Sequence, residues 1–358
     1  MCDSSLFEAS LAGFLVTFVL SFGLSIAKHF HGIFTFVNHG RAQDSYSTPT
    51  PRIGGIPLIL GYLTAWFCLE GEEKALWGLI GLSGLPALFF GLVEDMTHKV
   101  SIRVRLIATL GSGVIFAFLS GYTITSVNVW GVDFLLSIPF VAVVFTAFAI
   151  AGVANAINLI DGFHGLASGT LLIILVSFGL VAWRVDDFVL ANLSMLAAII
   201  IIGFFFFNFP FGKIFLGDAG AYFCGFFVAT LAVMLPGRNP EVSPWVSLLI
   251  LGYPVAETLA SIIRRHFDQH AHVGESDTAH LHHLVNRTSA KCLADITHLR
   301  QYQNPITSII MWMMPVATLL AVETSSLKTV PTIILLVCFV VFYMASYRVL
   351  MLRDNNSK

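Results

Sequence analysis

The sequence predicts an all-α, polytopic integral membrane protein with about eleven transmembrane helices. The chain has 358 residues, of which 56% are hydrophobic and only 11% are charged, and its mean hydropathy is +0.83. A typical soluble domain carries about 25% charged residues. Because a water-soluble core could not bury this much apolar surface, the composition favours a multi-span membrane protein.

Eleven apolar runs approach the length of about 20 residues that a helix needs to cross a bilayer. The first run follows a segment without Lys or Arg, unlike the basic start of a cleaved signal peptide, so we expect a retained helix with its N-terminus outside. The expected spans cover about 11–27, 54–70, 75–93, 103–121, 134–154, 166–183, 188–207, 220–236, 245–262, 306–322 and 330–347.

The distribution of positive charge supports this count. With the N-terminus outside, fifteen of the nineteen Lys and Arg residues fall on the cytoplasmic side, as the positive-inside rule requires. The four others are Lys74, Arg184, Arg238 and Lys328. Residues 1–358 therefore form one membrane-embedded domain, whose longest cytoplasmic loop covers 263–305. The net charge of −2 argues against a nucleic-acid partner.

The first cytoplasmic segment with candidate chemistry follows the third span and reads "GLVEDMTHKVSIRVRL". The adjacent acids Glu94 and Asp95 suit a divalent metal or a general base. The cations that follow, Lys99, Arg103 and Arg105, suit a phosphate. The alternative is an ordinary charged loop that obeys the positive-inside rule.

The next segment, "NAINLIDGFHGLASG", lies at the cytoplasmic end of the fifth span. Asn155, Asn158 and Asp161 recur every three residues and share one face if the helix continues that far. A polar helix end that simply meets water is the alternative.

A glycine-rich segment, "FNFPFGKIFLGDAGAYFCGF", follows the seventh span. Asn208, Lys213 and Asp218 lie among glycines, which let the backbone approach a phosphate closely. A single carboxylate there suits a Mg²⁺ ion shared with substrate phosphates, and Phe215 suits stacking on a base ring. The alternative is a turn between two helices.

The 263–305 loop carries Arg265 and the histidines His280, His282 and His283. A cradle for a phosphate or a sugar is one interpretation, a zinc site is a second and a solvated loop is a third. Arg52 adds a cation at the entrance to the second span. Acids, cations, glycines and histidines at one membrane face together predict metal-dependent phosphoryl transfer.

These segments resemble, in order, the motifs of the polyprenyl-phosphate N-acetylhexosamine-1-phosphate transferases, from about residue 51 to residue 284. The resemblance implies transfer of a sugar-1-phosphate from a UDP-N-acetyl sugar to undecaprenyl phosphate in the bacterial cytoplasmic (inner) membrane, with release of UMP. It implies Mg²⁺ as cofactor. Mn²⁺ in its place and a homodimer stay open alternatives.

The resemblance also assigns roles to individual residues. The expected catalytic residues are Glu94, Asp95, Asp161 and Asp218. Glu94 and Asp95 fall where a general base is expected, and Asp95 and Asp218 are the expected metal ligands. Asp161 and the following residues are expected around the nucleotide, the metal and the diphosphate or sugar: Asn155, Asn158, His164, Asn208, Lys213, Phe215, Arg265, His280, His282 and His283. The lipid phosphate is expected near Arg52, Lys99 and Arg103.

Two positions depart from the family pattern. Glu94 replaces the usual first Asp of an Asp-Asp pair, so the base can be either Glu94 or Asp95. His164 replaces a second Asp in the Asn-rich motif, and a histidine here bears on substrate choice. Both departures favour the branch that starts O-antigen or other surface polysaccharides over the phospho-MurNAc-pentapeptide transferases of peptidoglycan synthesis. A transporter or flippase and an inactive scaffold protein are the alternatives from other classes.

Overall fold

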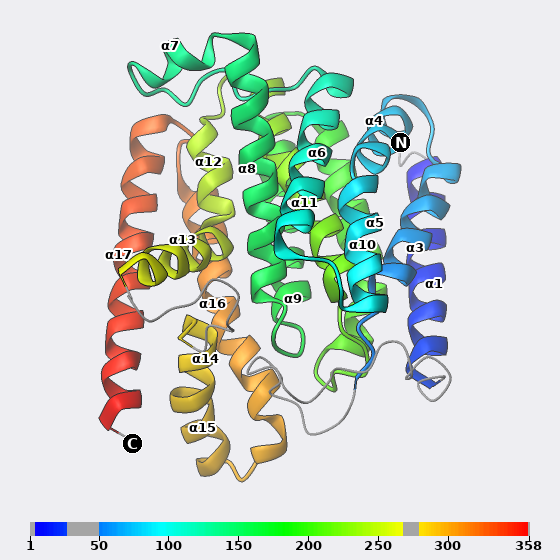
Figure 1. The fold of residues 1–358 in the computed structure, drawn as a ribbon. Helices are drawn as coiled ribbons and strands as arrows, with labels where there is room; N and C mark the ends of the chain where they lie inside the picture. Colours follow the sequence, from blue (N-terminus) through cyan, green and yellow to red (C-terminus); the bar gives the residue numbers. More distant parts are fainter. Residues whose placement is uncertain (1–3, 27–49, 268–278, 357–358) are drawn as a thin grey trace.

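The computed structural model of the chain describes residues 4–26, 50–267 and 279–356. Within these ranges all regular elements are helices, most of them packed upright in one bundle (Figure 1), which confirms the predicted all-α membrane fold. The first half contains α1 (Ser4–Ile26), α3 (Gly55–Cys68), α4 (Gly71–Ser83), α5 (Leu85–Thr97), α6 (Ile102–Ser120), α7 (Val132–Leu136), α8 (Pro139–Ile160) and α9 (Leu166–Arg184). The second half contains α10 (Phe188–Asn208), α11 (Gly217–Arg238), α12 (Pro244–Ile250), α13 (Gly252–Phe267), α14 (Leu281–Val285), η1 (Asn286–Ala290), α15 (Lys291–Ile296), η2 (Arg300–Tyr302), α16 (Gln303–Thr324) and α17 (Thr329–Asn356).

The eleven apolar runs expected to span the membrane all fall on helices or helix pairs. Among the described residues, eight helices are long and apolar enough to cross a membrane, and two bent pairs raise the number to as many as ten. The remaining run forms α3, which is a shorter apolar helix of 14 residues. The number of complete crossings and the side that faces the cytoplasm stay predictions.

Two of the expected spans are broken rather than continuous. The 75–93 run forms α4 and α5, which meet at 49°, and the 245–262 run forms α12 and α13, which meet at 79°. Both breaks carry Gly-x-Pro, at Gly84–Pro86 and at Gly252–Pro254. A proline has no N–H to donate and is compatible with the first turn of a new helix. As a result, α13 lies across the bundle rather than along it (Figure 1).

Helix α11 forms the centre of the bundle, where it contacts α3, α5, α8 and α9. Nearly all of its side chains are buried. Small residues let its neighbours approach closely, because a Cβ atom on Gly225 would lie 2.8 Å from the Cα atom of Ala154 in α8. This close packing fixes the position of the N-terminus of α11, which carries Asp218.

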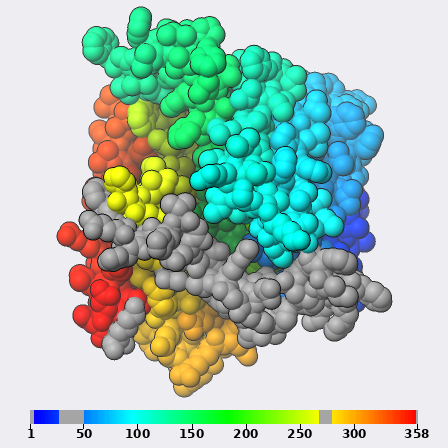
Figure 2. Space-filling view, viewed as in Figure 1, coloured from blue at the N-terminus to red at the C-terminus, as the bar shows by residue number. Residues whose placement is uncertain are grey.

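Each end of the bundle carries its own group of charged side chains. We call the end where α5 and α8 terminate and α11 begins the site end, and the opposite end the far end. At the far end Arg238 donates to Asp187 and to Glu72, both at 2.8 Å. Residues 121–138, which include α7, project beyond the far end (Figures 1 and 2). The four cations expected outside the cytoplasm lie on the helix ends or connections at the far end.

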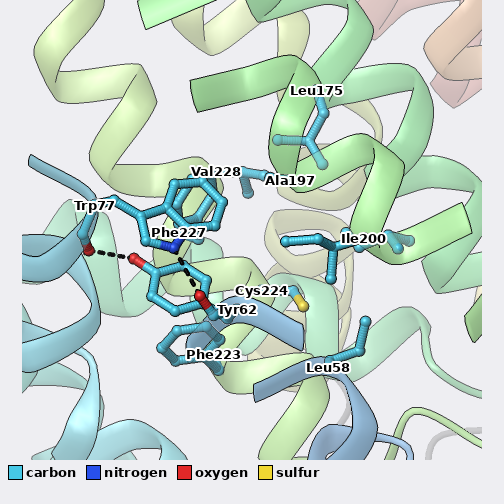
Figure 3. Close-up of a pocket in the computed structure, with 11 residues that line it drawn as sticks. Leu58, Tyr62, Trp77, Leu175, Ala197, Ile200, Phe223, Cys224, Phe227 and Val228 are labelled. Carbon is cyan, nitrogen blue, oxygen red and sulfur yellow. Dashed lines mark hydrogen bonds between the residues drawn. The ribbon is translucent and has the colours of Figure 1, made fainter. Parts of the chain in front are cut away.

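Two cavities lie away from the site end. The first, of about 30 Å³, is lined mostly by apolar side chains around Tyr62 and Trp77 (Figure 3). The rings of Tyr62 and Trp77 stack at 4.2 Å, and each side chain donates a hydrogen bond to the other's backbone carbonyl. The second, of about 650 Å³, lies at the far end between residues 123–129 and helices α8, α11 and α12. The first cavity is far smaller than a sugar-nucleotide site, so we assign it to helix packing.

Candidate active site

Asp218 is the point where four helix ends and loops meet. It lies in the first turn of α11 and is only 5% exposed. Its carboxylate accepts hydrogen bonds from Arg105 of α6 and, at 3.1 Å, from the side-chain amide of Asn158 of α8. The Nη2 atom of Arg52, just before α3, lies 3.6 Å from its Oδ1 atom. The structure thus brings together three residues that are more than 50 positions from Asp218 in the chain.

Asp95 holds the N-terminus of α11 beside this cluster. Its Oδ1 atom accepts the backbone N–H of Asp218 at 2.8 Å, and its Oδ2 atom accepts the N–H of Ala219 at 2.9 Å. These N–H groups have no partner inside the helix, and the positive end of the helix dipole favours a carboxylate there. Glycine makes the approach possible, because a Cβ atom on Gly91 would lie 2.7 Å from the Cα atom of Ala219. Asp95 therefore positions Asp218, whereas its expected role as a metal ligand stays a prediction.

Glu94 is also buried, but it faces a different partner. One of its carboxylate oxygens, Oε2, accepts the backbone N–H of Val100 at 2.8 Å, which ties the end of α5 to the loop before α6. The two adjacent acids are therefore held differently: both oxygens of Asp95 accept helix N–H groups, and Oε2 of Glu94 accepts one loop N–H.

The Asn-rich segment reaches the cluster as the helical spacing predicts. Asn158 contacts Asp218 directly, and Asn155 donates to the hydroxyl of Thr109 in α6 at 3.1 Å. Asp161 follows the last residue of α8 and accepts the N–H of Gly217 at 3.2 Å. Gly217 has a φ of +72°, which favours glycine, and this conformation turns the chain into α11. Asp161 and Asp218 therefore lie on either side of one turn.

Burial raises the pKa of Asp161 to about 7. The cation of Arg52 and the N–H of Gly217 oppose this shift, while the charge of Asp218 adds to it. When no cation is bound, Asp161 therefore carries a proton in about half of the protein molecules at neutral pH. A cation that binds beside Asp161 would favour the ionised carboxylate, so the proton would be released and Asp161 would carry a full negative charge.

We expect Asp161→Asn to change how stability depends on pH. The folded protein holds a proton on Asp161 that the unfolded chain releases above about pH 4, so this group's contribution to stability falls as pH rises from about 4 to 7. In detergent with EDTA, the melting temperature of Asp161→Asn should match the wild type near pH 4 and exceed it near pH 8. A difference between the two proteins that does not vary with pH would contradict the assignment.

The cations expected to hold the lipid phosphate separate into two groups. Arg52 lies beside Asp218 because its loop pairs with the segment before α11: Gly54 donates to the carbonyl of Phe215 at 2.9 Å. Lys99 and Arg103 are exposed instead. Arg105, which we did not assign to the lipid phosphate, is the cation that bonds Asp218.

Helical periodicity could have identified Arg105. The buried face of α6 includes Thr109, Ser112 and Phe116, and Arg105 continues this face one turn earlier. Arg103 lies on another side of the helix. The position of each cation on α6, rather than its place in the loop sequence, decides which one reaches α11.

The glycine-rich segment before α11 is held by two buried polar contacts. Asn208 donates to the carbonyl of Ile214 at 2.8 Å and accepts the hydroxyl of Ser168 at 2.6 Å, so it shapes the loop. Phe215 is 2% exposed, and Lys213 is exposed with its ammonium group 5.6 Å from the ring of Phe211. Asn208 thus acts on the backbone, and the ligand contacts expected for Asn208, Lys213 and Phe215 stay predictions.

His164 links this loop to the Asn-rich segment. Its Nδ1 atom lies 3.0 Å from the carbonyl of Pro210, so Nδ1 carries the hydrogen, and its ring lies 5.7 Å from that of Phe215. Burial lowers the pKa of His164, although the Pro210 carbonyl opposes this shift. The ring is therefore neutral at pH 7 and packs against the loop near Phe215.

The histidine loop meets the Asn-rich segment through Phe163. The rings of His282 and His283 lie 5.5 and 5.3 Å from the ring of Phe163 and 4.7 Å from each other. Burial lowers the pKa of His282, and the charges of His283, His280 and Arg264 lower it further. His282 is therefore a neutral hydrogen-bonding group rather than a cation.

The remaining predicted residue, Arg265, is half-buried in the last turn of α13. Residues 268–278 of the predicted 263–305 loop lie outside the described ranges. Within the part of the chain that the structure describes, no three His, Cys, Asp or Glu side chains gather as a ready-made metal site, the histidines of this loop included.

The fold and this cluster define a polytopic membrane protein with buried carboxylates, arginines and histidines collected at one end of its bundle. The profile of glycosyl transferase family 4 matches residues 77–236, which include Glu94, Asp95, the Asn-rich segment and Asp218. The chain belongs to glycosyl transferase family 4.

Three relatives illustrate the range of this family. A probable undecaprenyl-phosphate N-acetylglucosaminyl 1-phosphate transferase of Bacillus subtilis is 28% identical over 66% of this chain. A phospho-N-acetylmuramoyl-pentapeptide-transferase of Streptococcus pyogenes is 31% identical over 60% of this chain and 66% of its own length. A decaprenyl-phosphate N-acetylglucosaminephosphotransferase of Mycobacterium tuberculosis is 24% identical over 78% of this chain and 76% of its own. The match spans 65% of the length of the Bacillus relative.

Proposed function

We propose that this protein transfers an N-acetylhexosamine-1-phosphate from a UDP-sugar to undecaprenyl phosphate, or a similar polyprenyl phosphate, and releases UMP. In the net reaction, the phosphorus bound to the sugar exchanges its bond to UMP for a bond to an oxygen of the lipid phosphate. The observation that supports this proposal is the Asp218 cluster, which comprises Asp218 and its neighbours Asp95, Asp161, Arg52, Arg105 and Asn158. It joins carboxylates to two arginines, which suit a diphosphate, at the site end of a bundle of apolar helices.

The arginines supply the charge that such a reaction needs. Arg52 and Arg105 both face Asp218, so a phosphate that enters the cluster meets two cations held in place by an acid. Pre-positioned charges of this kind stabilise the negative charge that develops in phosphoryl transfer. The two arginines therefore bind and orient the diphosphate or the lipid phosphate.

The structure favours Glu94 over Asp95 as the group that accepts a proton. Both oxygens of Asp95 already accept helix N–H groups, and moving this side chain would release the N-terminus of α11. We therefore propose that Glu94 is the base for the lipid phosphate and that Asp95 holds Asp218 in position.

The donor set also fits the Mg²⁺ ion that the family implies. Mg²⁺ prefers oxygen ligands and is usually held by one or two carboxylates together with substrate phosphates. Asp218 and Asp161 are hard oxygen donors on either side of the Gly217 turn. These two residues would hold the ion, which would neutralise charge on the diphosphate.

The donor and the pathway are further parts of the proposal. Relatives named for N-acetylglucosamine transfer and for phospho-MurNAc-pentapeptide transfer both match this chain. We propose a UDP-N-acetylhexosamine donor for a surface polysaccharide such as O-antigen, because Glu94 and His164 depart from the usual pattern. UDP-MurNAc-pentapeptide is the second candidate donor.

Mass spectrometry of the lipid product tests both candidates. Purified protein in detergent, with Mg²⁺ and undecaprenyl phosphate, would be given UDP-GlcNAc, UDP-GalNAc, their 6-deoxy relatives or UDP-MurNAc-pentapeptide in parallel. We expect a lipid diphosphate sugar from one of the N-acetylhexosamine donors. A product from the pentapeptide donor alone would overturn the proposed pathway, and a product from none would overturn the reaction.

A further inference from the structure

Glu257 is a fully buried acid that no motif identified. It lies on α13 and its exposed fraction is 0%. Its Oε1 atom lies 3.0 Å from Nδ1 of His280 and accepts the backbone N–H of Leu281 at 2.9 Å. Its Oε2 atom accepts the hydroxyl of Tyr343 at 3.0 Å. A buried carboxylate is costly unless it is hydrogen-bonded, and three donors satisfy this one.

These contacts decide which nitrogen of His280 carries the hydrogen. Oε1 already accepts the N–H of Leu281, so it is also the acceptor in its contact with His280. Nδ1 of His280 therefore donates to Oε1, and Nε2 is the nitrogen left to exchange a proton or accept a bond. The backbone N–H of Leu281, the first residue of α14, bonds the same oxygen. Glu257 therefore fixes both the orientation of the His280 ring and the start of α14. Glu257 therefore acts on the first histidine of the motif and on its backbone.

The acid is itself held by the last helix of the chain. Tyr343 of α17 is 1% exposed and donates to Glu257. One further contact joins the same two helices, because Arg264 donates to the hydroxyl of Tyr347 at 3.3 Å. The α13–α17 pair thus supports the first histidine of the motif through Glu257.

We propose that Glu257 is a positioning residue for the site: it holds His280 in the Nδ1–H form and keeps the histidines against the Asn-rich segment. The inference rests on the proposed function for its role, since His280 would then present Nε2 to the diphosphate or sugar. Carboxylates that orient a working histidine commonly contribute about 10- to 100-fold to activity.

A double-mutant cycle tests this role. Glu257→Leu should lower kcat by about 10- to 100-fold, and Glu257→Gln, which keeps an acceptor, should lower it less. In a His280→Ala background either change should lower kcat by less than about 2-fold. The effects of two substitutions are not additive when one residue acts through the other. Equal losses in the two backgrounds would overturn the proposal, and Glu257→Gln carries the test if Glu257→Leu does not fold.

Asp187→Asn is the matched control for this cycle. Asp187 is also a buried acid with three donors, namely Arg238, Asn239 and the N–H of Leu190, but it lies at the far end. Its loss should lower the melting temperature and leave kcat within about 2-fold. An equal fall in kcat for Asp187→Asn would show that the Glu257 effect reflects stability alone.

A second measurement separates this inference from the proposed function. Nitrogen NMR of histidine-labelled protein in detergent reports which ring nitrogen carries hydrogen, and His280→Asn assigns the signal. We expect the Nδ1–H form in the wild type and a shift toward a mixture in Glu257→Leu. The Nε2–H form in the wild type, or an unchanged signal in the variant, would overturn the inference whether or not the protein releases UMP.

Discussion

Asp218→Asn is expected to lower the rate of UMP release by at least about 100-fold, the cost of losing one pre-positioned polar group at a reacting phosphate or carbonyl. The change removes the charge that Arg52 and Arg105 both face, and it removes one of the two carboxylates that we propose would hold Mg²⁺. The variant should also need more Mg²⁺ to reach its residual rate. The measurement is UMP release at saturating donor and lipid, repeated over a series of Mg²⁺ concentrations.

The control for this prediction is again Asp187→Asn, because that acid is buried and paired with an arginine at 2.8 Å but lies at the far end. If Asp218→Asn and Asp187→Asn lose the same stability, only the first should lose activity. Full activity in a folded Asp218→Asn protein would remove Asp218 from the site.

Arg105→Ala is expected to lower activity by about 10- to 100-fold, whereas Arg103→Ala should cost less than about 3-fold. The two arginines are two residues apart, have the same charge and begin the same helix, so they form a matched pair. Of these two arginines, Arg105 hydrogen-bonds Asp218, whereas Arg103 is exposed. The comparison uses kcat and KM for undecaprenyl phosphate, measured for both variants under one set of conditions.

A larger loss for Arg103→Ala would support the original sequence assignment of the lipid phosphate and contradict the structural one. Similar losses of activity for Arg103→Ala and Arg105→Ala would indicate that α6 acts through its total positive charge. Arg105→Lys adds a useful refinement: a lysine keeps the charge but lacks the planar group that bonds a carboxylate and a phosphate together.

The fold follows from the sequence because the hydropathy signal is strong. Each of the eleven runs is long and apolar, and each forms a helix or a helix pair. Hydropathy averages over a window and does not report a change of direction, so the bends at Gly84 and Gly252 were not predicted. Proline alone would not have identified them, since Pro236 and Pro315 lie inside continuous helices. The combination Gly-x-Pro is the local signal that both bends share.

The site was predicted in part, and the missing part has a physical reason. Spacing placed Asn158 and Asp161 on one face, and the structure brings both beside the start of α11. Arg105 was named among three cations that suit a phosphate but was not singled out, because its role depends on which way α6 faces. Glu257 was missed because its role depends on what packs behind the histidines. Glu257 still had a signal in the sequence: an acid inside an apolar run is costly and is therefore a candidate for function.

The most direct test of the central claim is whether UMP release requires both substrates and Asp218. Wild-type protein and Asp218→Asn would be assayed with each UDP-sugar, with and without undecaprenyl phosphate, beside an active relative. We predict release by the wild type with at least one donor, only when the lipid is present, and almost none by the variant. No release with any donor, or release that does not depend on the lipid, would contradict the account.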